Sequence, residues 1–108
     1  MSDSLGEFEQ IVLLALVRLG EEAYGASVRR EIAERTGRDV STGAVYATLD
    51  RLESKGLVRS ALGEPTAQRG GRAKRHFEIT GEGSRALRRS QQAFARMLEG
   101  LPARWRHA

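Results

Sequence analysis

The apolar residues of the first segment, Gly6 to Leu19, cover nearly the whole circumference of a helix after Gln10. A helix that is apolar all round has to be covered on every side. In a domain this small, we expect one side of this helix to face the protein's own core and the other to face a second subunit. Gly20 provides the signal that ends the helix.

The second segment, Tyr24 to Thr36, has apolar residues at every fourth position, with charged residues between them. This spacing of Tyr24, Val28 and Ile32 predicts an amphipathic helix that ends at Gly37. Tyr24 could stack on a base or an effector, but its helical spacing with Val28 favours a place in the core.

A third helix is predicted from Ser41 to Glu53, because Val45, Leu49 and Leu52 fall on one narrow stripe at about 100° per residue. Ser41 or Thr42 can cap its start, and a lysine followed by a glycine closes its end. The opposite face carries small and polar side chains that are free to meet a ligand: Gly43, Ala47, Asp50, Arg51 and Ser54, flanked by Thr42 and Tyr46.

Two strand-like runs follow, Leu57 to Leu62 and Lys74 to Ile79, joined by a long basic connection. Adjacent glycines in this connection allow positive φ angles and a close approach to a ligand backbone. A helix followed by a charged hairpin is the layout of a winged DNA-binding domain, and the hairpin is predicted to grip phosphates. Its candidate DNA-binding residues are Arg69, Gly70, Gly71, Arg72, Lys74 and Arg75.

The last helix is predicted from about Gly81 to Glu99, with Thr80 as its cap. Leu87, Phe94 and Leu101 are seven residues apart, which indicates a heptad-like seam that packs on another helix. The seam could instead cover this subunit's own core. A homodimer is favoured, because the first helix also has an apolar side that its own core does not need. The expected interface comprises Phe8, Ile11, Leu14, Ala15, Leu87, Ser90, Phe94, Met97, Leu98 and Leu101.

Size and composition predict three parts within one compact unit. The 108 residues, 40% of them hydrophobic, suffice for one domain. We expect a DNA-binding domain over residues 1–80, a dimerisation helix over residues 81–101 and a flexible tail over residues 102–108, since Pro102 discourages a longer helix. The predicted fold class is mainly α with a small β-hairpin (α+β), a winged helix-turn-helix with a C-terminal dimerisation helix.

Charge is distributed unevenly along the chain. Residues 1–34 hold three arginines against seven acidic residues, whereas residues 35–108 hold fifteen Lys or Arg against seven acidic residues. The basic part begins near the third helix, which predicts one face that attracts the phosphates of double-stranded DNA.

Several function classes are disfavoured by the residues that are missing. The chain has no cysteine, which excludes disulfides, thiolate zinc sites and thiol nucleophiles, and which fits a reducing compartment. Two histidines, His76 and His107, make a poor metal site without paired carboxylates. The N-terminus lacks a signal-like basic region, and the apolar run Ile11 to Val17 is too short to cross a bilayer. We therefore expect a cytoplasmic protein with no cofactor, no metal and no enzymatic activity.

Four segments together resemble the PadR family of transcriptional regulators: residues 6–16, 23–28, 41–58 and 70–83. A Gly-x-x-Tyr motif in the third helix, a Leu-Glu-x-x-Gly-Leu exit and an aromatic-x-Ile-Thr-x-x-Gly ending of the wing follow one another in this order. The resemblance covers about residues 5–98 and implies a winged helix-turn-helix, a homodimer built through the last and first helices, and usually repression. It is strongest to the short subfamily with a single C-terminal helix.

Two positions depart from the family pattern. Many members have proline directly after the tyrosine of the third helix, where this chain has Ala47, so base contacts in the first turn are expected to differ. Some short relatives bind planar drugs between tryptophans at the dimer centre, but the only tryptophan here, Trp105, lies beyond Pro102. A small-molecule effector at the dimer interface is implied by the resemblance alone.

The resulting hypothesis is a dimeric repressor that reads an inverted repeat whose half-sites are about one helical turn, or a multiple, apart. The alternative is an architectural DNA-coating protein without sequence preference. The expected DNA contacts on the third helix are Ser41, Thr42, Gly43, Tyr46, Ala47 and Arg51.

Overall fold

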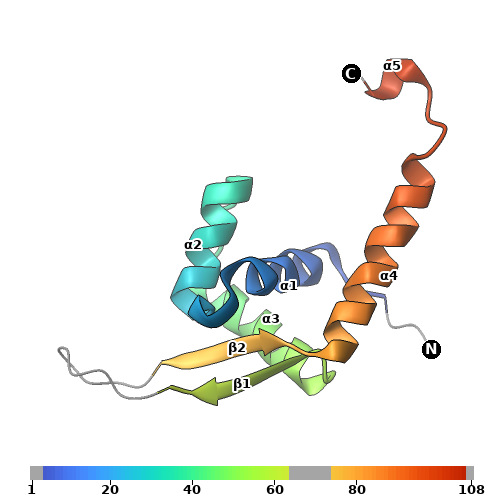
Figure 1. The fold of residues 1–108 in the computed structure, drawn as a ribbon. Coiled ribbons are helices and arrows are strands. Elements are labelled where there is room, and N and C mark those ends of the chain that lie inside the picture. The colour runs from blue at the N-terminus through green and yellow to red at the C-terminus, as the bar shows by residue number, and fades with distance from the viewer. Residues whose placement is uncertain (1–3, 64–73, 107–108) are drawn as a thin grey trace.

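A computed structural model describes residues 4–63 and 74–106. In these residues, one small antiparallel hairpin lies at one edge of a group of helices (Figure 1), which confirms the predicted fold class, mainly α with a small β-hairpin. The elements in chain order are α1 (Glu7–Leu19), a 3-10 turn η1 (Gly20–Glu22), α2 (Gly25–Thr36), α3 (Thr42–Ser54), β1 (Val58–Leu62), β2 (Arg75–Ile79), α4 (Gly81–Leu98) and α5 (Ala103–Arg106).

The helix boundaries are set by caps that the sequence displays. Ser41 Oγ accepts a hydrogen bond of 3.0 Å from the backbone N–H of Ala44, and Thr80 Oγ1 accepts one of 3.0 Å from Gly83. Each bond satisfies a backbone donor that the first turn of a helix leaves unpaired. Gly37 ends α2 in the left-handed region with φ 77°. The predicted capping roles of Ser41 and Thr80 are therefore confirmed.

Strand β2 connects the hairpin to the helices through backbone hydrogen bonds. Its register pairs Val58 with Ile79 and Ser60 with Phe77. The backbone N–H of Phe77 donates to the carbonyl of Ala23 at 2.9 Å, and Tyr24 forms an isolated bridge with His76. The hairpin therefore has a fixed position relative to the start of α2.

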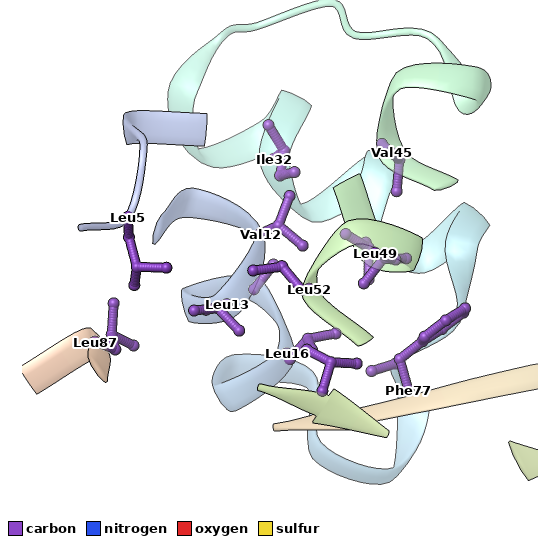
Figure 2. Close-up of a cluster of buried hydrophobic side chains, with 14 of the residues drawn as sticks. Leu5, Val12, Leu13, Leu16, Ile32, Val45, Leu49, Leu52, Phe77 and Leu87 are labelled. Carbon is purple, nitrogen blue, oxygen red and sulfur yellow. The ribbon is translucent and has the colours of Figure 1, made fainter. Parts of the chain in front are cut away.

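The core lies between α1, α2, α3 and the hairpin. Figure 2 shows side chains from all of these elements pointing into one cluster. The predicted stripe of α3 is confirmed, because Val45, Leu49 and Leu52 are fully buried. Tyr24 departs from its expected place in the core: it is only half-buried, at the position before α2, where its ring contacts His76.

Helix α4 runs away from the body of the protein (Figure 1). One side of its first turns is buried, and Leu87 joins the core cluster together with Leu5 (Figure 2). All side chains from Gln91 to Gly100 are exposed. The apolar side chains Phe94, Met97 and Leu98 are 61%, 77% and 51% exposed. The outer half of α4 thus has an apolar side that the described chain does not cover.

Three sequence expectations for this region need correction. Ala15 and Leu87 are 3% and 6% exposed and pack into the protein's own core, so they are not available to a partner. The heptad spacing does not continue along the helix to Leu101, because Glu99 is extended and Gly100 has a φ of 71°. Residues 103–106 form the short helix α5 within the segment that was expected to be a tail.

Candidate nucleic-acid interface

The outward face of α3 is the first part of the candidate interface. Thr42, Gly43, Ala47 and Asp50 are all exposed on it. The prediction that this side of α3 is exposed is confirmed. Thr48, which the apolar pattern did not single out, is 3% exposed and belongs to the inner side.

The hairpin lies directly beside α3. Ser60 Oγ donates to Glu53 Oε2 at 2.8 Å, and Arg75 Nη2 donates to Glu53 Oε1 at 3.3 Å. Both bonds join the last turn of α3 to the two strands. The expected partners, a helix and a hairpin, are therefore adjacent elements of one surface.

Arg75 and Lys74 have partners at the base of the hairpin. Arg75 Nε donates to Ser60 Oγ at 3.0 Å, and its guanidinium lies 5.7 Å from the centroid of the Phe77 ring. Lys74 Nζ lies 4.1 Å from the centroid of the Tyr24 ring. These two cations brace the hairpin, in addition to any contact with DNA. The expected contacts at Arg69, Gly70, Gly71 and Arg72 lie outside the described residues.

Tyr46 is only partly available to a ligand. It is 37% exposed, its ring lies against Gly25, and it meets Phe77 edge-on with 6.2 Å between ring centroids. Its exposed edge lines a shallow cavity of about 410 Å³ between α2 and α3. The ring therefore fixes α3 on α2 and also borders the candidate interface.

The same cavity contains two arginines that sequence reasoning missed, Arg29 and Arg30. Arg29 Nε donates to the carbonyl of Val40 at 2.7 Å, and its Nη2 lies 3.6 Å from Asp39 Oδ1, so Arg29 braces the turn that leads into α3. Arg30 is exposed, with no ion-pair partner among the residues described. The sequence could have pointed to these two arginines through their position on α2, because they lie on the side of the helix away from its buried residues.

Arg51 is held at the edge of the interface by a carboxylate from α1. Its Nε lies 3.3 Å from Glu9 Oε2, and Lys55 Nζ lies 2.9 Å from the same oxygen. Burial by itself raises the pKa of Glu9. Hydrogen bonds from the backbone of Gly6 and from Lys55 and Arg51 outweigh burial, so the pKa lies below its usual value. Glu9 is therefore ionised near neutral pH and offsets part of the positive charge on this flank of α3.

Neither a metal site nor a membrane-spanning helix is found in the described part of the chain. No three His, Cys, Asp or Glu side chains gather there in a way that could hold a metal ion. Among the same residues, no helix has the length and apolar content needed to span a membrane.

Comparison with known proteins decides the family. The sequence profile of the PadR-like family of transcriptional regulators matches residues 13–89. This chain belongs to the PadR family. The resemblance noted in the sequence is thereby confirmed. Among curated proteins, the comparison found no match.

Solved structures of PadR proteins have the same fold. A PadR family regulator from Eggerthella lenta is 28% identical, with 87% of this chain and 81% of that chain covered and a TM-score of 0.66. A PadR-like transcription factor from Bacteroides fragilis is 23% identical, with coverage of 85% and 84% and a TM-score of 0.72. A PadR regulator from Clostridium difficile is 24% identical, with coverage of 83% and 90% and a TM-score of 0.66. The last two identities are low enough that they show the fold alone.

PadR membership gives this chain a general role. The family consists of transcriptional regulators, which supports DNA binding by this winged helix.

Proposed function

We propose that this PadR protein is a dimeric repressor that binds an inverted-repeat operator and can be released by a small-molecule effector. The observation that carries the proposal is the pairing of an exposed α3 face with a hairpin fixed beside it through Glu53. Helix α3 would enter the major groove, and the hairpin would follow the neighbouring backbone.

The composition of the α3 face supports base contact. Gly43 and Ala47 are small and exposed, so the helix backbone can approach the base edges closely. The Ala47 methyl can contact a thymine methyl, and the Thr42 hydroxyl can donate to or accept from a base. Asp50 lies on the same face, where it would accept from a cytosine amino group and would repel phosphate. Such a face favours particular base pairs over others.

Exposed apolar side chains on two helices support a dimer. The outer half of α4 presents Phe94, Met97 and Leu98, and α1 presents Leu14 and Val17 at 41% and 55% exposure. Apolar side chains that gather on one side of a helix indicate an interaction site, because their burial is favourable. A twofold pair of winged helices matches a twofold operator.

Release by an effector is suggested by the family resemblance, and the same arrangement offers a route for it. The α4 helices of the pair would set the distance between the two α3 helices. A ligand that favours a different α4 packing would shift the population towards a spacing that no longer fits both half-sites.

Selection of bound sequences from random duplex DNA, followed by footprinting, tests this proposal. We expect an inverted repeat with half-sites about 10 base pairs, or a multiple, apart. Operator binding should be tighter than random-DNA binding by about 10³-fold or more at matched salt. A ratio near one would instead identify an architectural DNA-coating protein.

A pair of variants ties the binding to α3. Ala47→Glu places a carboxylate on the exposed α3 face and should abolish selective binding. Ala103→Glu makes the same change at an exposed position outside α3 and α4 and should leave binding intact. Equal binding by both variants would show that α3 does not read the DNA.

A further inference from the structure

Glu9 is the nearly buried member of an ion-pair cluster that joins α1 to α3. Its side chain is 9% exposed, whereas those of its partners Arg51 and Lys55 are 53% and 44% exposed. A third donor, the backbone N–H of Gly6, lies 2.9 Å from Glu9 Oε1. Both carboxylate oxygens thus have donors, and two full positive charges meet at one of them.

Two other ion pairs, Arg38–Glu7 and Arg59–Glu78, are much more open to water. Glu7 is 76% exposed in its pair with Arg38, and Arg59 and Glu78 are 68% and 65% exposed. Pairs of that kind contribute little and exchange readily. Removing the cations from a shielded carboxylate such as Glu9 costs far more, because the remaining charge is left without water.

Arg51 is also tied to its own helix. Its Nη2 lies 3.4 Å from Thr48 Oγ1, on the inner side of α3. The guanidinium is therefore held towards α1, at the edge of the exposed face that contains Ala47. A free arginine at this position could reach a neighbouring phosphate.

We propose that Glu9 is a positioning residue that holds Arg51 and Lys55 back from the DNA backbone and so limits the sequence-independent part of binding. This inference rests on the proposed reading of DNA by α3. Phosphate contacts supply nearly all of non-specific binding, whereas base contacts supply selectivity. Because Glu9 keeps two cations away from the phosphates, the base contacts supply a larger share of the binding free energy.

The salt dependence of binding measures this effect directly. Each phosphate contact contributes about 0.9 to the slope of log K against log salt concentration. Glu9→Gln keeps the shape and one oxygen acceptor but removes the charge. We expect its slope to steepen by up to about 1.8 per protomer, with affinity for random DNA rising more than affinity for the selected operator.

Glu34→Gln is the matched control. Glu34 is exposed on α2, and the described residues place no cation in an ion pair with it. The substitution removes the same charge without releasing a held cation, so its slope should stay close to that of the unmodified protein. If Glu9→Gln gives the same slope as Glu34→Gln, the proposal is overturned.

A second variant tests whether Arg51 and Lys55 bind phosphate in the unmodified protein, even if Glu9→Gln alone fails to fold. Glu9→Gln combined with Arg51→Gln and Lys55→Gln removes the whole cluster, so no shielded charge is left without a partner. This variant should leave the slope unchanged, because in the unmodified protein the two cations are held by Glu9. A slope that becomes shallower by about 1.8 per protomer would mean that both already bind phosphate, and would overturn the inference. Selective binding by the unmodified protein in the same titrations tests the proposed function independently.

Discussion

The ring of Tyr46 lies against the Cα of Gly25, at a point where α3 crosses the start of α2. A Cβ built on Gly25 would lie 2.3 Å from both Cζ and Oη of Tyr46. No residue larger than glycine fits there unless the ring moves, and the ring also packs edge-on against Phe77. This contact sets how α3 is seated on the rest of the winged helix.

Gly25→Ala should therefore push the Tyr46 ring outward and destabilise the protein by about 1–3 kcal/mol, as overpacking generally does. Chemical unfolding measures the change. Gly43→Ala is the matched control, because its nearest atom, Ser41 Oγ, is 3.9 Å away. That variant should stabilise the protein by up to about 1 kcal/mol through helix propensity. Similar unfolding free energies for the two variants would contradict the close packing at Gly25.

Gly83 makes an even tighter contact where α4 meets the hairpin. A Cβ there would lie 2.2 Å from the backbone oxygen of Leu57 and 2.8 Å from Ile79 Cγ1. Backbone cannot move aside as easily as a side chain, so Gly83→Ala should cost about 3 kcal/mol or more. At Gly81 the nearest atom is Arg85 Nη1 at 3.5 Å, and Gly81→Ala should change stability by less than about 0.5 kcal/mol. Thermal unfolding of both variants checks this, and an equal loss would refute it.

Met97→Glu tests the proposed dimer. Met97 is 77% exposed, so the substitution should leave the folded protomer intact while placing a charge in the apolar side of α4. Sedimentation equilibrium should show mostly monomer at micromolar concentration. Gln92→Glu introduces the same carboxylate on the other side of α4 and should remain dimeric. A dimer that survives Met97→Glu unchanged would place the interface elsewhere.

Stability at acid pH should depend on Glu9. Its pKa is lowered on folding, so its ion pairs contribute stability that is fully present above the unfolded value of about 4.5. That contribution is lost as the pH falls through the lower pKa of the folded state. The difference in unfolding free energy between the unmodified protein and Glu9→Gln should therefore shrink as the pH falls below about 4.5. A difference that stays constant over this range would contradict the shift.

Local signals in the sequence were enough to predict most of the elements. Helix starts at Ser41 and Thr80 depend on side chains that cap the first turn, and the end at Gly37 depends on a glycine that tolerates positive φ. These interactions span only a few residues, so they can be read from sequence. The α3 stripe was predictable for the same reason, since one helical period contains the information.

Long-range contacts could not be read in this way. Helix α1 is apolar on nearly all sides, so its pattern does not distinguish Ala15, which is buried, from Leu14, which is exposed. Glu9 and Arg51 are 42 residues apart, and only the fold brings them together. The seven-residue spacing up to Leu101 was misleading, because backbone geometry at Glu99 and Gly100 ends the helix first.

The uncovered outer half of α4 has a consequence for regulation through protein abundance. If operator binding requires two chains, then at concentrations where most chains are single, halving the chain concentration lowers the amount of pairs about fourfold by mass action. Dilution during cell growth would then relieve repression more sharply than the drop in copy number alone.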